Sequence, residues 1–381
     1  MCSSVIYSLR WAVCVADKEI KMAEKKFYNY ISDMKIVCLM LVIFGHCAIY
    51  YISTSPYISH LGVSSPFVDK MFDVFDMTLM PAFVIGSGFL YANSITRNKN
   101  ATILSELTRR SKRILLPFLL WGVFWVVPMY TTFNVIGYGR PENAGYLEGY
   151  KYLFLGCFAE HLWLLLMLFW VTLVFILLKP LISKKLLPLT AVIAVGLAIA
   201  AQYLLDGIEY YKLGQIAPFI LIYFIGIAIY YYSEQLEKLP VAVLLLSSAV
   251  MLVISIFMIP YKNQHFLFHW IGWITGGISL LLFFLVIDRL GVNDKLHKTR
   301  FWKFTSRNSM IIYLYNCPIM QIYYKLLSKK IGDNVALCVS VLFVMSMITL
   351  YIITFVHERT AKMLRERFKN AGLGKKEKKE A

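Results

Sequence analysis

Residues 35–47 read KIVCLMLVIFGHC, a stretch that is apolar between its opening lysine and its closing histidine and cysteine. Similar apolar blocks recur along the 381-residue chain, and many reach the ~20 residues that a helix needs to cross a bilayer. Hydrophobic residues make up 59% of the chain and charged residues only 16%, whereas a soluble domain carries about 25% charged residues. The sequence therefore predicts an all-α fold, a polytopic bundle of transmembrane helices.

About ten of these blocks qualify as transmembrane helices by length and apolar content. They lie at residues 31–53, 71–94, 114–134, 161–179, 186–205, 215–232, 240–259, 268–288, 308–327 and 334–356. Most of the 39 lysine and arginine residues fall in segments that face the cytoplasm if both termini lie on that side. Because basic residues concentrate in cytoplasmic loops, we predict that both termini are cytoplasmic.

The chain divides into one transmembrane domain and two short flanking segments. Residues 1–27 form an N-terminal cytoplasmic segment, and Met22 is a sensible alternative start, which would make the residues before it an extension. The transmembrane domain is expected over residues 28–356. Residues 357–381 form a basic tail that begins as an amphipathic helix and suits a surface anchor.

The net charge of +17 lies in short basic runs between apolar blocks, which is typical of cytoplasmic membrane-protein loops rather than of a nucleic-acid-binding surface. The seven cysteines have irregular spacing and no CxxC pair, so we expect neither a disulfide framework nor a metal site. His265 and His269 have the i, i+4 spacing of metal ligands, but no further ligand is near them in sequence. We therefore predict no bound metal.

His46 is the leading polar residue inside a predicted span, where an ionisable side chain is costly. It lies 11 residues after Lys35, about 16 Å along a helix and close to three whole turns, so both side chains occupy one helical face. Lys35 sits near the cytoplasmic boundary and His46 near the middle of the membrane. From this geometry alone, His46 is either a functional residue or an interior histidine that bonds to a neighbouring helix.

Arg110 and Arg113 lie at i and i+3 in RRSKRILLPF, residues 109–118, where the cytoplasm meets the third predicted span. Their side chains share one helical face, and the planar guanidinium group suits phosphate oxygens. The alternative is a plain basic anchor at the end of a span.

Three further motifs place polar or small residues near predicted spans. Glu160, His161 and Trp163 open the fourth span from its outer side, where a tryptophan is ordinary and a Glu-His pair is less so. MPAFVIGSGFLY, residues 80–91, carries small residues around Ser87 that allow close helix approach and a hydrogen bond between helices. NSMIIYLYNCP, residues 308–318, places an asparagine and Pro318 inside the ninth span, where the proline should kink the helix.

Taken in order, these elements resemble the acyltransferase 3 family, whose members are bacterial membrane proteins that modify cell-surface carbohydrates. The matching elements are Lys35 and His46; Met80, Pro81, Phe83, Ser87, Gly88 and Phe89; Arg110, Arg113 and Pro117; His161, Leu162 and Trp163; residues 223–227; and residues 309–314. The resemblance extends from about Tyr28 to about Thr354. Each element alone is weak, but six in order on such a scaffold are specific.

The resemblance implies an enzyme, an acyl-CoA-dependent O-acyltransferase in the bacterial cytoplasmic (inner) membrane. Family members move an acyl group, usually acetyl, from cytoplasmic acyl-CoA to a hydroxyl of a glycan or glycolipid precursor. The expected partners are therefore acyl-CoA as a co-substrate, a glycan or lipid-linked sugar as the acceptor, and the lipid bilayer. No permanently bound cofactor and no nucleic acid are expected.

The resemblance also implies roles for individual residues. His46 would be the catalytic residue and Lys35 its partner, while Arg110 and Arg113 would hold the CoA phosphates. With the phosphates at the cytoplasmic face, an extended pantetheine arm would carry the thioester inward, and His46 lies at a suitable depth to accept a proton from the acceptor hydroxyl. Glu160 is a lesser candidate, an acid near the acceptor side. Further motif residues are Ser87, His161, Trp163 and Asn316.

Two positions depart from the family pattern. Many members have arginine where this chain has Lys35, which keeps the charge and loses the bidentate geometry. Many also have a second histidine in the ninth span, where this chain has Asn316, so the resemblance does not imply a second catalytic histidine in that span. A transporter or flippase of a glycolipid or acyl compound is the alternative, because it also needs intramembrane polar residues. The paired arginines and the lack of internal repeats favour the enzyme.

Overall fold

A computed structural model describes residues 28–53, 63–133, 145–156, 160–331 and 334–380. The described residues are almost all helical and contain no strand, which confirms the predicted all-α fold. The N-terminal segment predicted at residues 1–27 lies outside the described residues.

Within the described part of the chain, eight helical segments are long and apolar enough to cross a membrane. They are Asn29–Tyr51 (α2, Asn29–Ala48, and η1, Ile49–Tyr51), Pro66–Arg97 (α4), Ile103–Thr132 (α5, Ile103–Trp121; the π-helical turn η2, Gly122–Val126; and α6, Val127–Thr132), Leu187–Leu205 (α9), Tyr210–Tyr231 (η5, Tyr210–Gln215, and α10, Ile216–Tyr231), Val241–Tyr261 (α12, Val241–Met258, and η6, Ile259–Tyr261), Phe266–Arg289 (α13) and Val335–Leu364, the apolar part of α16 (Val335–Glu380).

The remaining two predicted spans are also helical. The fourth corresponds to α8 (Trp163–Leu177), which is apolar but has only 15 residues and follows the short turn η3 (Glu160–Leu162). The ninth lies within α15 (Arg300–Ile331), which is long enough to cross but carries polar residues such as Asn316 and Gln321. Each predicted apolar block therefore forms a helix, and these two differ from the others in length or polarity.

Four further short helices of the described residues lie between the longer ones. They are α7 (Tyr146–Phe154), η4 (Lys179–Leu181), α11 (Ser233–Leu236) and α14 (Asn293–Lys298).

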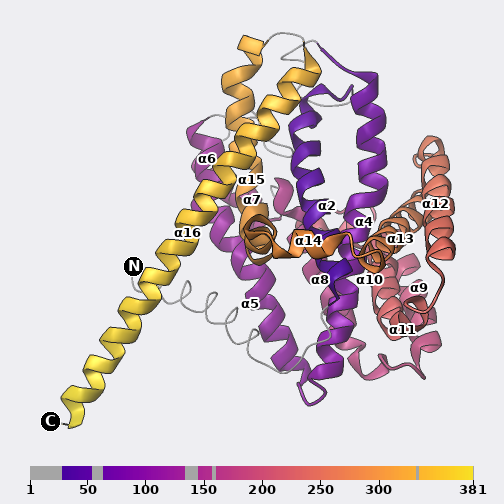
Figure 1. Cartoon of the computed structure of the whole chain (residues 1–381), viewed down its shortest axis with the longest axis horizontal. Helices are drawn as coiled ribbons and strands as arrows, with labels where there is room; N and C mark the ends of the chain where they lie inside the picture. Colours follow the sequence, from indigo (N-terminus) through magenta and orange to yellow (C-terminus); the bar gives the residue numbers. More distant parts are fainter. Residues whose placement is uncertain (1–27, 54–62, 134–144, 157–159, 332–333, 381) are drawn as a thin grey trace.

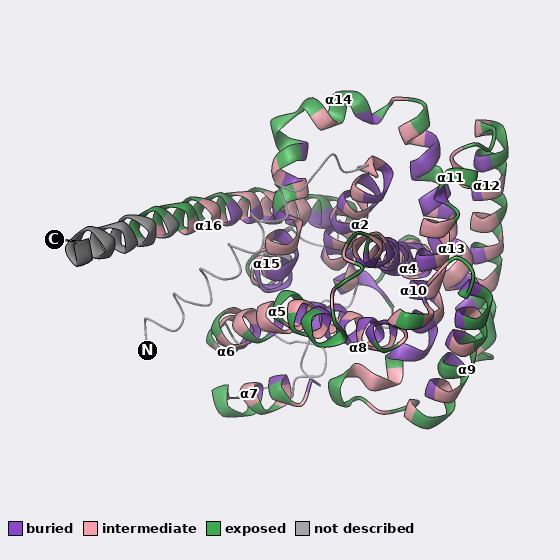
Figure 2. Ribbon diagram, turned by 90° about the horizontal axis from the view of Figure 1, so that it is seen from below, coloured by how far each residue is buried: buried purple, intermediate pink, exposed green. Residues whose placement is uncertain are grey.

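The bundle surrounds α2, which packs against α4, α13, α15 and α16. Figure 2 shows α2 near the middle, with buried residues gathered on α2, α4, α8 and α10. Helices α9 and α12 form one edge, and α16 extends away from the opposite edge (Figure 1). Only 17% of the 18-residue apolar stretch of α12 is buried, and 28% of that of α9. The apolar side chains of these two helices are therefore available to lipid.

The backbones of α4 and α10 approach each other through two glycines. A Cβ atom on Gly88 would lie 2.1 Å from the carbonyl oxygen of Tyr223, and one on Gly226 would lie 2.1 Å from that of Ile85. Any side chain at either position would therefore separate the two helices. This contact explains, in physical terms, why the SGF motif and residues 223–227 both contain glycine.

Contacts along α2 set the relative depth of residues in the neighbouring helices. Lys35 reaches Ser87, whereas Gly45 lies against the ring of Phe75, so α2 and α4 run in opposite directions. A first contact between α2 and α15 joins Cys47 Sγ to Met320 Sδ at 3.4 Å, near the end of α2.

A second contact between α2 and α15, 3.3 Å between the hydroxyls of Ser32 and Ser306, shows that these two helices run in the same direction.

A buried carboxylate joins the start of α2 to α14 and α15. Asp33 is fully buried. Its oxygens accept hydrogen bonds from Asn293 Nδ2 at 2.6 Å and Trp302 Nε1 at 2.8 Å, and His297 Nε2 lies 2.9 Å away. These contacts attach the segment before the ninth predicted span to the centre of the bundle.

The basic tail continues from the last span as part of α16. Arg307 of α15 forms a 2.7 Å ion pair with Glu358 at the start of this tail. The tail is therefore joined to α15 as well as to its own span.

Candidate active site

Lys35 points from α2 towards α4. Its Nζ donates a 3.4 Å hydrogen bond to Ser87 Oγ and lies 4.3 Å from the centre of the Phe83 ring. Ser87 Oγ in turn donates to the Phe83 carbonyl at 2.9 Å. A Cβ atom on Gly86 would lie 3.4 Å from Lys35 Cδ. The absence of a side chain at Gly86 therefore leaves room for the Lys35 side chain to pass along α4. The expected hydrogen bond of Ser87 to another helix is present, and Lys35 is its partner.

Arg110 and Arg113 approach Lys35 from α5. Both guanidinium groups lie close enough to the Lys35 ammonium to repel it electrostatically. Arg110 lies 5.2 Å from the centre of the Tyr91 ring, and its buried Nε has no hydrogen-bond partner. Arg113 is exposed. The structure therefore brings three predicted site residues together at one end of the bundle.

Glu106 is a buried carboxylate in this basic region that the sequence analysis missed. It is 1% exposed and forms a 2.7 Å ion pair with Arg109, which also donates to Ser94 Oγ at 2.8 Å. The Arg110 Nε lies 3.9 Å from the same carboxylate. Glu106 precedes Arg109 by three residues and Arg110 by four, and this spacing could have predicted the ion pair from the sequence. Glu106 therefore holds Arg109 and lies close to Arg110.

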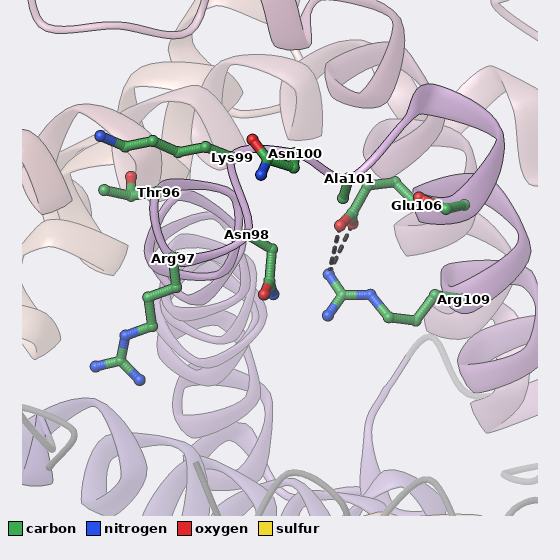
Figure 3. A pocket seen from close by; sticks show the side chains of 9 residues that line it. Thr96, Arg97, Asn98, Lys99, Asn100, Ala101, Glu106 and Arg109 are labelled. Atoms are coloured by element: carbon green, nitrogen blue, oxygen red, sulfur yellow. Dashed lines mark hydrogen bonds and ion pairs between the residues drawn. The ribbon is translucent and has the colours of Figure 1, made fainter. Parts of the chain in front are cut away.

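A cavity of about 680 Å³ lies beside this group, at the turn from α4 to α5. Its lining residues are Thr96, Arg97, Asn98, Lys99, Asn100, Ala101, Ser105, Glu106 and Arg109. Figure 3 shows the Arg109 side chain extending towards Glu106, with Asn98 on the opposite side. Three cations therefore line the cavity, while the predicted pair Arg110 and Arg113 is not part of its lining.

His46 lies on α2 eleven residues beyond Lys35. The residue is partly exposed, but its Nδ1 is buried without a hydrogen-bond partner. An unpaired nitrogen inside a membrane bundle is costly, and such groups usually have a functional reason to persist.

His161 lies in η3 and is only 4% exposed. Its Nε2 is 3.2 Å from the carbonyl oxygen of Leu314 on α15, and the Tyr313 hydroxyl donates to the His161 carbonyl. The two rings pack edge to face at 5.7 Å. His161 is therefore held to α15 by its ring and by its backbone.

His46 and His161 lie in the same region of the bundle. His46 lies close enough to His161 to interact with it electrostatically, and the Nδ1 atoms of both rings are buried without a partner. Asn316, two residues after Leu314, is fully buried, and both polar atoms of its amide lack a partner. The second imidazole near His46 thus comes from η3, before α8, while the ninth span contributes an asparagine.

The other two residues of the Glu-His-Leu-Trp element have different surroundings. The Glu160 backbone opens η3, and its side chain lies outside the described part of the structure. Trp163 packs 6.0 Å from Phe219 of α10, and Phe219 packs 4.8 Å from Trp273 of α13. An aromatic row therefore extends from the neighbourhood of His161 to α13.

A carboxylate and a histidine at the far end of this row were missed as a pair by the sequence analysis. Asp76 Oδ2 lies 3.9 Å from His269 Nε2, and the His269 ring packs 4.2 Å from Trp273. Asp76 follows Phe75, which contacts Gly45, so Asp76 lies at about the depth of His46. The repeated aspartates in PFVDKMFDVFD, residues 66–76, were the available signal.

The histidine pair considered for a metal separates in the structure. His265 Nδ1 accepts the backbone N–H of Leu267 at 3.2 Å and caps α13, whereas His269 faces Asp76. Of the seven cysteines, the four that the structure describes are buried and outside any disulfide, and a buried thiol of this kind packs as a small apolar side chain.

Fold and site together define a multi-pass membrane protein with a basic group at one end and buried, unpaired polar groups deeper inside. Residues 28–356 match the acyltransferase 3 family model, which is described as an acyltransferase domain. Because this match covers most of the chain, the chain belongs to the acyltransferase 3 family, as the sequence motifs predicted. Comparisons with curated proteins and with solved structures gave no match. Family membership indicates an acyltransferase with an acyl donor and an acceptor, working in a bilayer.

Proposed function

We propose that the protein transfers an acyl group, acetyl in the usual case for this family, from cytoplasmic acyl-CoA to a hydroxyl of a surface polysaccharide or a glycolipid precursor. The observation that carries this proposal is the arrangement along α2. Lys35 lies among arginines at one end, and His46 lies eleven residues further along, about 16 Å away. This separation suits a donor whose phosphates and reactive thioester are far apart.

The donor phosphates would bind at the basic end of the bundle. Arg110 and Arg113 provide guanidinium groups near Lys35, and guanidinium groups bind phosphate oxygens in a bidentate geometry. Basic residues in this region also support its assignment to the cytoplasmic face of a bacterial inner membrane, where acyl-CoA is found.

His46 would act as the general base at the thioester end. It removes the proton of the acceptor hydroxyl, whose oxygen attacks the thioester carbonyl carbon. A C–O bond forms, the C–S bond breaks, and the departing CoA sulfur takes up the proton that His46 carries. No metal or further cofactor is needed to balance this reaction.

The acceptor sugar would approach along the aromatic row of Trp163, Phe219 and Trp273. Aromatic faces suit the apolar faces of sugar rings, and the carboxylate of Asp76 can accept hydrogen bonds from hydroxyl groups. Asp76 lies at about the depth of His46, which supports an acceptor position between the two. Membership in an acyltransferase family favours transfer over the transporter or flippase alternative.

The central test is the His46→Ala variant. We expect it to insert normally and to abolish the ester groups on the surface polysaccharide, measured by NMR of polysaccharide from mutant and parent cells. His265→Gln is the control, because the ring of this histidine is engaged in capping α13. Undiminished ester signals in His46→Ala cells would show that the proposed mechanism is wrong.

The donor site has a separate test. Replacing both Arg110 and Arg113 with alanine should weaken acyl-CoA binding at least about tenfold, since two charge-assisted contacts to phosphate are lost. Titration calorimetry of the purified protein in detergent measures this affinity. Lys112→Ala is the matched control, because Lys112 is an exposed cation between the two arginines. Equal affinities for the parent and the double variant would exclude these arginines from the donor site.

A further inference from the structure

Pro318 leaves a backbone carbonyl of α15 free for another partner. It lies inside this helix and has no N–H, so it cannot donate the helical hydrogen bond to residue 314, four positions earlier. The Leu314 carbonyl oxygen is instead 3.2 Å from Nε2 of His161. The proline and the histidine, 157 positions apart in sequence, are thereby parts of one local arrangement.

This contact determines which ring nitrogen of His161 carries the proton. A carbonyl oxygen can only accept a hydrogen bond, so Nε2 must be the protonated nitrogen. In a neutral imidazole the other nitrogen then has a free lone pair. For His161 this is Nδ1, which is buried and has no hydrogen-bond partner.

His46 offers the complementary group. Its Nδ1 is likewise buried without a partner, and the two imidazoles are within electrostatic reach of each other. If His46 carries its proton on Nδ1, that N–H and the lone pair on His161 can satisfy each other through one bridging water. Catalytic hydrogen bonds are often long without substrate and shorten when it binds.

We propose that His161 is a positioning residue that holds His46 in the tautomer with its lone pair on Nε2. The order of groups is the Leu314 carbonyl, His161, His46 and the acceptor hydroxyl. This inference rests on the proposed function, in which His46 is the base. The arrangement also stabilises the charge that His46 gains when it takes the hydroxyl proton, as the orienting member of a catalytic triad does.

Two isosteric replacements of His161 separate its two contacts. His161→Gln places an N–H donor where Nε2 lies and loses the acceptor at Nδ1, whereas His161→Asn places an acceptor oxygen near Nδ1 and loses the donor to Leu314. We expect His161→Gln to lower the maximal rate at least about 100-fold, the scale of general-base catalysis. His161→Asn should stay within about tenfold of the parent. A purely structural role predicts the opposite order, because glutamine keeps the contact to α15.

Pro318→Ala tests the source of the free carbonyl. The new backbone N–H can bond to Leu314 within the helix and compete with His161, so we expect a roughly tenfold lower maximal rate without loss of thermal stability. Pro188→Ala is the control, because Pro188 lies in the first turn of α9, where a proline displaces no helical hydrogen bond.

The assay uses [14C]acetyl-CoA and membranes from producing cells, and counts the label in the glycan fraction. Unchanged KM for acetyl-CoA with a lower maximal rate is the expected pattern for both His161→Gln and Pro318→Ala. If His161→Gln membranes are as active as parent membranes while His46→Ala membranes are inactive, the positioning role is wrong and the proposed function stands. If His46→Ala membranes also match the parent, the proposed function itself is wrong.

Discussion

Asp76 is an ionisable residue whose importance depends on its depth in the bundle. Near an aqueous boundary it would be an ordinary aspartate, but Phe75 beside it contacts Gly45 of α2, which places Asp76 level with His46. His269 Nε2 lies 3.9 Å from its carboxylate, too far for a hydrogen bond, and Lys262, a cation within electrostatic reach of Asp76, forms its ion pair with Asp73. A carboxylate at this depth that shares Lys262 with a second aspartate is expected to serve a ligand.

At the residue scale we predict that Asp76→Asn lowers ester formation about tenfold, because an amide accepts hydroxyl hydrogen bonds less strongly than a carboxylate. Acyl-CoA binding should stay unchanged, since the basic group near Lys35 is untouched. NMR of the surface polysaccharide and calorimetry with acyl-CoA provide the two measurements.

Asp69→Asn is the control for this prediction. Asp69 Oδ1 accepts the Ser53 N–H at 2.7 Å, a contact that an asparagine oxygen can also make. Loss of acyl-CoA binding in Asp76→Asn, or full ester content, would contradict an acceptor role for this carboxylate.

The basic region shows what sequence spacing can and cannot predict for single residues. Arg110 and Arg113 were expected to share one face, and both lie near Lys35. Glu106, which pairs with Arg109, was missed because a glutamate before a basic run also suits an exposed helix. Its burial depends on the helices around it, and no local pattern reports that.

At the scale of elements, the contact between α4 and α10 determines the position of Ser87. Gly88 lies against the Tyr223 carbonyl, and the preceding Ser87 turns towards Lys35. The small residues of MPAFVIGSGFLY predicted a close approach, but the partner helix could not be predicted, because any helix with a matching small residue would fit.

We predict that Gly226→Ala destabilises the protein by about 1–3 kcal/mol or more, the range for overpacking in a tight contact. The new Cβ would lie 2.1 Å from the Ile85 carbonyl oxygen, so α4 and α10 must separate. Thermal unfolding in detergent measures the effect.

Gly196→Ala is the matched control in α9, where a Cβ would meet nothing within 4 Å. Alanine there should stabilise the helix by about 0.5–1 kcal/mol, because glycine is a poor helix former. Opposite signs are thus expected for the same chemical change at two helical glycines, and similar melting temperatures for both variants would refute this explanation.

Pro318 was expected to kink the ninth span, and its clearer consequence concerns hydrogen bonding. It leaves the Leu314 carbonyl to His161. The sequence indicates that a carbonyl is released, because this follows from the chemistry of proline. Which side chain donates a hydrogen bond to that carbonyl depends on the packing of η3 against α15.

At the scale of the whole molecule, the burial of each helix matches its place in a membrane. In each of the central spans α2, α4 and α13, 61% of the 18-residue apolar stretch is buried, whereas in α12 the buried share is 17%. The exposed apolar side chains of the outer helices would be unfavourable in water and are satisfied by lipid.

The distribution of basic residues predicts that both ends of the chain face the cytoplasm. A protease site appended after Ala381 should therefore be cut in inside-out membrane vesicles and protected in intact spheroplasts. A site inserted between α2 and α4 serves as the control and should show the reverse pattern. Cleavage of the C-terminal site from outside the cell would refute the predicted orientation.

The sequence by itself determined the class of protein, the helical segments and the family, because a segment's transfer into lipid depends on its own length and composition. It also placed His46 at its depth above Lys35, since helix geometry is local. Only the tertiary structure decided which polar groups of different segments approach each other: His161 and His46, and Asp76 and His269. These pairs join residues on different helical segments, whose relative rotation is decided by packing and glycine contacts. The local sequence of a helix contains little information about that rotation.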